Sequence, residues 1–288
     1  MDHRGSQLTD LAAYREQSRT SWREVAAGWE RRRDWFREVS GPVTEWLLDH
    51  ADPQPGETFL ELAAGTGDLS LALAERVGPH GRVVASDFAP EMIDAARRAG
   101  LERGAANVDY RVLDAERLDL DDASVDGVVC RFAFMLMADP GAALAGARRA
   151  LRPTGRLALA VWQGPDRNPW AALPAATLVR LGHAPPPEPG TPGIFALADP
   201  NRIRALVTAA GFSDAAVEEI AFTFRYADAD ELWDTLLSVS GSFSRALAAL
   251  DDDERQAVRA AVEEAVAPFR EDDGSYTPPA AAWGVVAR

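Results

Sequence analysis

The chain has 288 residues, a formal net charge of −15 and a hydrophobic content of 47%, and all 30 of its basic residues are arginine. This length and apolar content predict about two domains, or one α/β domain with a sizeable insertion. The acidic balance argues against nucleic-acid binding, and the absence of lysine excludes Gly-Lys phosphate loops, Schiff-base enzymes and the Tyr-x-x-x-Lys pair of short-chain dehydrogenases.

The cysteine and histidine content, together with the lack of long apolar runs, limits the kinds of site and the cellular compartment that we expect. The single cysteine, Cys130, excludes an internal disulfide and is typical of a reducing compartment. The four histidines are scattered and form no Cys/His cluster, so we expect no metal site. No apolar run reaches the ~18–20 residues of a membrane span. The first ten residues lack the apolar core of a signal peptide, so we expect a cytoplasmic protein.

The sequence pattern of residues 1–55 predicts an N-terminal helical lid. Trp22, Val25, Ala26 and Trp29 recur at helical spacing, and Gly41-Pro42 opens a second helix. We therefore expect two amphipathic helices between residues 8 and 50 that cover one face of a sheet.

The chain is organised around the stretch that follows. Residues 58–63 form a short apolar run, the glycine turn at 65–67 interrupts it, and leucines at helical spacing resume after Asp68. Strand, tight turn and helix form the first unit of a nucleotide-binding α/β fold. Glycine lets the backbone approach a ligand closely, and the helix start offers free N–H groups to an anionic group. A dinucleotide fingerprint would carry a third glycine where Ser70 stands.

Acidic residues end the next two predicted strands. The strand at 81–88 ends near Asp87, which lies 20 residues after Gly67, the offset of an acid that binds ribose hydroxyls. The strand at 108–115 ends at Asp114, and we expect Glu116 beside it to face solvent. Further strands are predicted at 124–131 and 156–162.

Two phrases carry a family resemblance. Glu61, Gly65 and Gly67 form an E-x-x-x-G-x-G arrangement, and residues 150–162 read ALRPTGRLALAVW. Together with the strand-end acids, they resemble the class I S-adenosylmethionine-dependent methyltransferases, nearest to the UbiE-like small-molecule branch. The resemblance covers roughly residues 22–162. It implies a Rossmann-like, doubly wound, seven-stranded sheet whose last strand is antiparallel, with S-adenosylmethionine as the cofactor.

The resemblance also implies roles for single residues. Glu61 would help to hold the methionine ammonium, Asp114 would accept from the adenine amine, and the tip of strand four would face the sulfonium. Phe88 and Met92 would pack on the adenine, or are plain core residues; Cys130 reads as a small buried residue rather than a nucleophile. The cofactor-binding set is then Trp29, Glu61, Ala63, Gly65, Thr66, Gly67, Asp87, Phe88, Met92, Asp114, Ala115, Cys130, Arg131 and Phe132.

Beyond residue 162 the composition changes. After the core at 56–162, we expect an irregular proline-rich insertion at 163–200 and a core helix and strand at 201–227. A helical cap at 228–275 and a final core strand at 276–288 would complete the chain.

The predicted reaction is methylation, at carbon or oxygen, of a small lipophilic or aromatic acceptor. The candidate base is His183 in the insertion, with Tyr14 as second choice. Two alternatives stay open: a cofactor-binding methyltransferase fold that acts as a cyclase or binding protein, and, less favoured, an NAD(P)-dependent dehydrogenase. The partners expected are the acceptor and, undecided, a second copy of the chain. The predicted acceptor pocket comprises Phe132, Phe134, Met135, Trp170, Phe195, Trp233 and Phe243.

Overall fold

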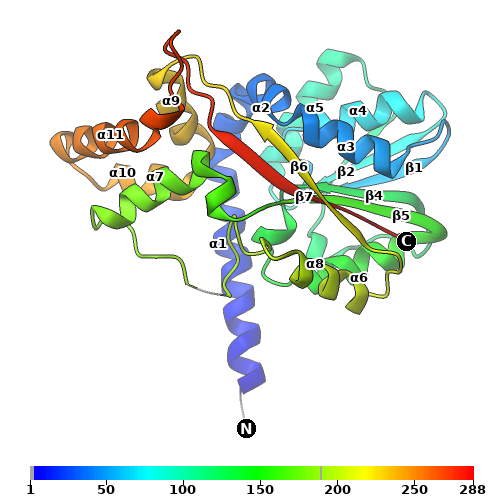
Figure 1. The fold of residues 1–288 in the computed structure, drawn as a ribbon. Coiled ribbons are helices and arrows are strands. Elements are labelled where there is room, and N and C mark those ends of the chain that lie inside the picture. The colour runs from blue at the N-terminus through cyan, green and yellow to red at the C-terminus, as the bar shows by residue number, and fades with distance from the viewer. Residues whose placement is uncertain (1–2, 189) are drawn as a thin grey trace.

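A single mixed sheet holds the molecule together (Figure 1). The computed structural model describes residues 3–188 and 190–288, with side chains from residue 11 onward. Its seven-stranded sheet has the order β3-β2-β1-β4-β5-β7-β6. Strands β1 to β5 pair in parallel, whereas β7 pairs antiparallel with both β5 and β6. The strands are β1 (Thr58–Leu62), β2 (Arg82–Asp87), β3 (Val108–Val112), β4 (Val125–Arg131), β5 (Leu151–Trp162), β6 (Ala216–Thr223) and β7 (Pro279–Ala287).

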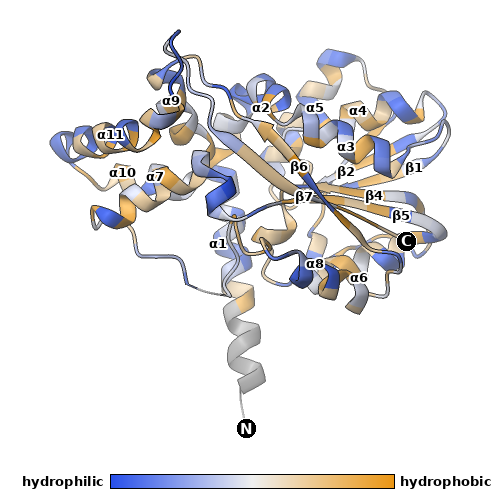
Figure 2. Cartoon of the chain, viewed as in Figure 1, coloured by the Kyte–Doolittle hydropathy of each residue, from blue (hydrophilic) through white to orange (hydrophobic). Residues whose placement is uncertain are grey.

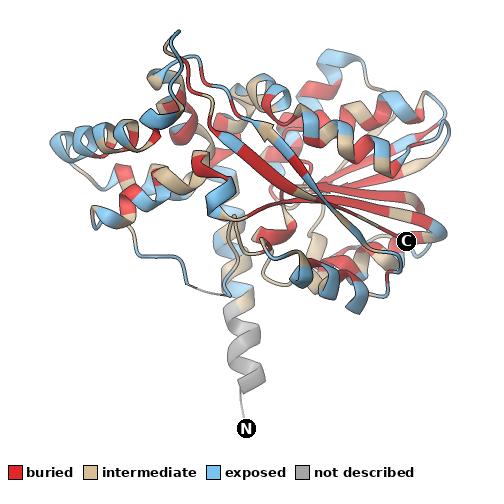
Figure 3. Cartoon of the chain, viewed as in Figure 1, coloured by how far each residue is buried: buried red, intermediate tan, exposed pale blue. Residues whose placement is uncertain are grey.

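The central strands are nearly continuous apolar runs because both faces of the sheet are covered. Figure 3 shows them as the buried interior of the molecule. Helices α3 (Gly41–Ala51), α4 (Asp68–Val77) and α5 (Pro90–Arg103) cover one face, while α6 (Pro140–Ala150) and α8 (Pro200–Ala209) cover the other (Figure 1). This arrangement confirms the doubly wound α/β fold with an antiparallel last strand.

The N-terminal region has one more helix than the sequence predicts. Helix α1 (His3–Arg31) is followed by α2 (Arg33–Val39) and then by α3. The unpredicted break falls at Arg32, between α1 and α2. The break that the sequence predicts falls at Ser40, whose hydroxyl donates to the carbonyl of Phe36, and Pro42 follows at the start of α3. Proline fits the first turn of a helix but lacks the backbone N–H that a continuous helix would need. Helices α2 and α3 therefore stay separate.

A second lobe packs beside the sheet. It contains α7 (Pro169–Arg180), α9 (Ala229–Val239), α10 (Gly241–Ala248) and α11 (Asp252–Val266), with orange apolar stripes in Figure 2. The expectation of an irregular insertion at 163–200 is wrong over α7. Pro169 stands at the helix start, and Pro174 inside the helix is buried, so packing outweighs the poor helix propensity of proline.

Short 3-10 turns link several elements: η1 (Ala115–Arg117), η2 (Phe134–Leu136), η3 (Pro165–Arg167) and η4 (Ala267–Phe269). In the part of the chain that the structure describes, no helix is long and apolar enough to cross a bilayer. Within the same residues, no group of three or more histidine, cysteine or acidic side chains is arranged to hold a metal ion.

Candidate functional site

One cavity lies where the parallel strands end, beside the switch point between β1 and β4. Ligands of open α/β sheets bind at such points. Its lining is mostly apolar with a few convergent polar groups, as is usual for a small-molecule site. Loops after β1, β2, β3 and β4 form its floor, and α1 and α2 form its outer wall. The lining residues used below are Tyr14, Arg15, Ser18, Trp22, Trp29, Phe36, Glu61, Ala63, Gly65, Thr66, Asp68, Asp87, Phe88, Met92, Asp114, Ala115, Glu116, Arg131, Phe132, Leu136 and Met137.

The glycine turn bends through left-handed backbone. Ala63, Gly65 and Gly67 have φ values of +55°, +54° and +86°. Gly65 faces open space, since a Cβ added there would meet no atom within 4 Å. A Cβ on Gly67 would lie 2.8 Å from the Cβ of Ala96 in α5. The turn therefore leaves room for a ligand at Gly65 and lets two helices approach at Gly67.

Asp87 braces this turn from the end of β2. Its carboxylate accepts from the backbone N–H of Gly65 at 3.0 Å and from that of Ala89 at 2.9 Å. Burial raises the pKa of Asp87 to about 6, although these backbone donors act to lower it. Each oxygen keeps a second lone pair, so the carboxylate can still accept from ligand hydroxyls.

Glu61 lies one residue before the end of β1 and is 2% exposed. The hydroxyl of Ser70 donates to its Oε2 atom. Burial raises the pKa of Glu61 to about 8, because the charged form loses its hydration. Ser70, which departs from the dinucleotide fingerprint, thus has a defined partner in the site.

Asp68 and Arg131 form a buried ion pair beside Glu61. Both carboxylate oxygens of Asp68 accept from Nη2 of Arg131 at 2.7 Å, and the two side chains are only 5% and 6% exposed. The other Arg131 terminal nitrogen donates to the hydroxyls of Ser40 (3.0 Å) and Thr44 (2.5 Å). The guanidinium is therefore fixed, and it ties β4 to α4 and α3.

The loop after β3 brings two acids to the cavity. Asp114 caps η1 by accepting from the N–H of Glu116 at 2.9 Å through one oxygen. The expectation that Glu116 faces solvent is wrong, since its side chain is 7% exposed and pairs with Arg15 of α1. A partner 101 residues away in sequence supplies the charge that makes its burial possible.

Aromatic rings form the opposite wall. Phe132, at the tip of β4, has a φ of +62°, which is rare for a bulky residue. Its ring stacks on Trp162 with centroids 3.8 Å apart and an interplanar angle of 7°. Phe36 lies edge-on to Trp29 at 4.7 Å, and the guanidinium of Arg131 lies 4.9 Å from the Phe36 ring centroid. The cavity thus joins acids on one side to aromatic rings on the other.

Comparisons with known proteins agree with this geometry. Residues 59–155 match a family described as a methyltransferase domain. The YcgJ protein of Bacillus subtilis shares the fold, with a TM-score of 0.56 and 17% identity over 85% of this chain and 96% of that one. A nocamycin O-methyltransferase of Saccharothrix syringae is 38% identical over 42% of this chain and 44% of its own.

A demethylmenaquinone methyltransferase of Thermus thermophilus is 34% identical over 58% of this chain and 79% of that protein. The chain belongs to the class I S-adenosylmethionine-dependent methyltransferases. It is similar to the UbiE-like branch of this family. The chain spans only 32% to 50% of the length of several other curated relatives that it matches.

The residues present in this class I family member fit the cofactor. Five acids line the cavity, Glu61, Asp68, Asp87, Asp114 and Glu116, against two arginines that are both paired with them. Such a site favours the ammonium and sulfonium charges of S-adenosylmethionine. It disfavours a pyrophosphate, because the N–H of Gly65 already donates to Asp87.

Most of the predicted cofactor residues meet at this cavity. Of the fourteen predicted, Gly67 and Cys130 do not line it. Gly67 packs against α5, and Cys130 is fully buried in the core, where burial raises the pKa of its thiol. Among the described residues, no histidine lines the cavity; His183 follows α7 and is half-buried there. Tyr14 lines the cavity, and its hydroxyl donates to the carbonyl of Leu136 at 3.1 Å.

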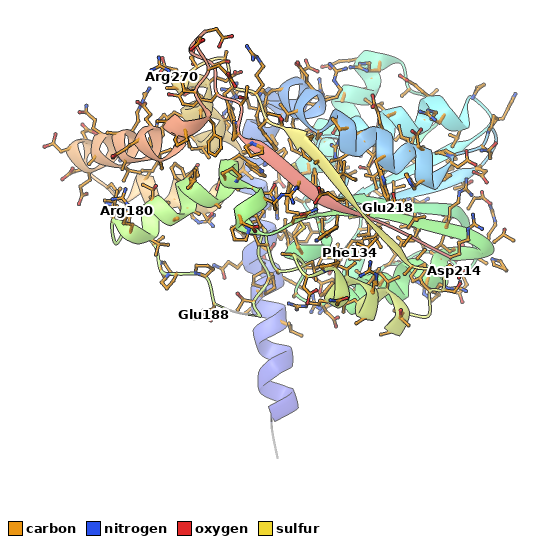
Figure 4. All side chains as sticks on the ribbon, in the orientation of Figure 1. Phe134, Arg180, Glu188, Asp214, Glu218 and Arg270 are labelled. Carbon is orange, nitrogen blue, oxygen red and sulfur yellow. The ribbon has the colours of Figure 1, made fainter. Side chains whose placement is uncertain are left out.

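The predicted acceptor pocket does not form as expected in this family member. Of its seven residues only Phe132 lines the cavity. Phe134, labelled in Figure 4, is buried in the core, and Trp233 pairs with Phe243 in the second lobe. The apolar wall instead includes Trp22 and Phe36. Trp22 shares the helical spacing of Trp29, which could have placed it in the site; nothing in the sequence pairs Phe36 with Phe132.

Proposed function

We propose that this protein binds S-adenosylmethionine in the cavity and transfers its methyl group to a small lipophilic or aromatic acceptor. The observation that carries the proposal is the single cavity that joins strand-end carboxylates to an aromatic wall. The carboxylates suit a cationic cofactor, and the rings Trp22, Trp29, Phe36 and Phe132 suit an apolar acceptor. The excess of acids disfavours an anionic acceptor.

Each group at the cavity would have a separate task. Asp87 would accept from the ribose hydroxyls, Asp114 from the adenine amine through its free oxygen, and Glu61 would face the methionine ammonium. Phe88 and Met92 would pack on the adenine. S-adenosylmethionine supplies a methyl group already activated by its sulfonium, so the protein mainly aligns the acceptor and excludes water, an effect worth about 10⁵–10⁸ M in effective concentration.

Neither candidate base gains support from its surroundings. Burial and, to a smaller extent, the negative charge of Glu116 raise the pKa of the Tyr14 phenol. Its hydroxyl donates to the carbonyl of Leu136. A phenol in that state does not accept a proton near neutral pH. We therefore assign Tyr14 to the wall of the site and leave proton removal to the acceptor's own acidity or to water.

The role of Asp87 tests cofactor binding. Asp87→Ala removes the ribose acceptor and should weaken S-adenosylhomocysteine binding by roughly 10- to 150-fold, at about 1.5–3 kcal/mol for one bond to a charged group. Calorimetry measures the affinity. Asp109→Ala is the matched control, because it removes an acid of β3 that is paired with Arg82 and Arg111 and lies outside the cavity. Equal affinities for both variants would reject the ribose role.

Methyl transfer itself needs a turnover experiment. The protein is incubated with methyl-labelled S-adenosylmethionine and a panel of phenols, quinols and polyketides. Release of S-adenosylhomocysteine with label in one acceptor is the expected result. Tight cofactor binding without release across the panel would favour a cyclase or binding protein, and binding of NAD in place of S-adenosylhomocysteine would overturn the proposal.

A further inference from the structure

Three ion pairs join α1 to the sheet-bearing core, and they differ in burial. The Arg15 and Glu116 side chains are 17% and 7% exposed. Arg23 and Glu91 are 53% and 40% exposed, and Arg98 and Glu30 are 53% and 31% exposed. Exposed pairs contribute little because water and salt screen them, whereas a buried charge depends on its partner. Among these described pairs, Arg15–Glu116 therefore dominates the attachment of α1.

Glu116 is the point where three segments meet. Its Oε2 atom accepts from Nε of Arg15 at 2.7 Å and from the N–H of Asp139 at 2.9 Å. Its Oε1 atom accepts from the N–H of Ala138 at 3.0 Å. Its own N–H donates to Asp114. One carboxylate thus connects α1, the loop after β3 and the entrance to α6.

The position of this pair matters as much as its strength. Arg15 and Glu116 line the cavity, and the next turns of α1 contribute Ser18, Trp22 and Trp29. The two tryptophans belong to the same apolar cluster as Phe88, which follows β2, and Met92 of α5. Helix α1 is therefore part of the outer wall of the cavity, and Figure 1 shows it passing the sheet and extending beyond it.

We propose that the Arg15–Glu116 pair positions α1 as the outer wall of the cofactor cavity and sets the rate at which the cofactor leaves. This inference rests on the proposed function, because it takes S-adenosylmethionine or its product as the occupant. Arg15 and Glu116 act as positioning residues: loss of either partner leaves a charge unpaired at the wall, and α1 separates from the core more often.

Dissociation kinetics test the proposal. S-adenosylhomocysteine is released from the full-length protein in a stopped-flow experiment followed by tryptophan fluorescence, since Trp22 and Trp29 line the cavity. Arg15→Ala and Glu116→Gln should each release it at least tenfold faster than the unmodified protein. Arg15→Lys keeps the charge but loses the planar guanidinium. Its release rate should lie between those of the unmodified protein and Arg15→Ala. Arg23→Ala is the matched control on the same helix and should stay within twofold.

The double variant Arg15→Ala/Glu116→Gln should release the ligand no faster than the faster single variant, because both changes break one interaction. Equal release rates for Arg15→Ala and Arg23→Ala would overturn the inference. If Arg15→Ala fails to fold, two milder variants decide the question by the same rates: Arg15→Lys, and Glu116→Gln, which keeps one acceptor oxygen for the N–H of Ala138 or of Asp139.

A measurement without ligand separates this inference from the proposed function. Chymotrypsin cleavage at Trp22 and Trp29 should be faster in Arg15→Ala than in Arg23→Ala, since α1 opens more often. Faster cleavage with no S-adenosylhomocysteine binding by any form would reject the cofactor while upholding the role of the pair. If S-adenosylhomocysteine binds normally, and Arg15→Ala and Arg23→Ala show equal cleavage and equal release rates, the positioning role of the Arg15–Glu116 pair is rejected while the proposed function stands.

Discussion

Glu61 and Asp87 hold their protons unusually tightly for carboxyl groups. Burial raises the pKa of Glu61 to about 8 and that of Asp87 to about 6. Near neutral pH the free protein therefore carries Glu61 largely as the acid. A cationic ligand stabilises the carboxylate form, so its binding should release a proton from Glu61. Burial makes ionisation of both acids costly in the folded protein, and a cationic ligand would offset that cost.

The burial of Glu61 has a consequence for stability. Its pKa rises from the ordinary value of 4.5 to about 8 on folding, so its contribution is fully present below pH 4.5 and is lost as the pH rises toward 8. Glu61→Gln cannot ionise and avoids this loss. Relative to the unmodified protein, we expect the free energy of unfolding of the variant to rise by at most about 1.4 kcal/mol per pH unit between pH 4.5 and 8.

Urea unfolding at pH 4.5, 6, 7 and 8 measures the difference. Asp87 titrates in both proteins, so subtracting one curve from the other isolates Glu61. Parallel stability curves for the two proteins would contradict the raised pKa. The same variant should bind S-adenosylhomocysteine more weakly, which separates the cost of Glu61 to the fold from its use in the site.

The glycine turn shows how one element constrains its neighbours. Gly67→Ala must place a Cβ in left-handed backbone, at about 1–2 kcal/mol, and against Ala96 of α5, at about 1–3 kcal/mol more. Gly65→Ala meets only the first cost, because its Cβ would meet open space. We expect Gly67→Ala to lower the urea midpoint clearly more than Gly65→Ala. Equal midpoints would mean that α5 moves aside freely.

At this scale the sequence predicts regular units well and long-range partners poorly. Strand, glycine turn and helix at 58–77 follow from local pattern, as does Asp87 at its fixed offset. The proline-rich segment misleads because Pro174 disfavours a helix that tertiary packing nonetheless forms. Arg15 and Glu116 lie 101 residues apart, and no periodicity relates them. The sequence mislocates the apolar wall of the cavity for the same reason.

The left-handed backbone at Phe132 also lies beyond sequence patterns. A glycine in the sequence suggests a left-handed conformation because it adopts positive φ readily, whereas a phenylalanine gives no such indication. Here the N–H of Phe132 donates to Ala160 at 2.8 Å while its ring stacks on Trp162, so two neighbours on β5 fix the residue. Strain of this kind persists where the surroundings enforce it, and it lies at the cavity.

Across the whole molecule, the Arg131–Asp68 pair joins helices α3 and α4 to the sheet. Arg131 at the end of β4 contacts Asp68 of α4 and the hydroxyls of Ser40 and Thr44 at α3. Arg131→Ala leaves the Asp68 carboxylate buried without its partner. Since such a loss costs about 3–5 kcal/mol, the variant should unfold at a much lower urea concentration.

The double variant Arg131→Met/Asp68→Leu separates pairing from packing. It removes both charges and keeps apolar volume, so it should recover most of the stability that Arg131→Ala loses. Arg152→Ala is the matched control: it breaks a pair with Asp126 at the start of the same strand, where the arginine is 43% exposed, and should cost under about 1 kcal/mol. If the double variant is as unstable as Arg131→Ala, the hydrogen bonds to Ser40 and Thr44, rather than the compensated charge, hold α3 against the sheet.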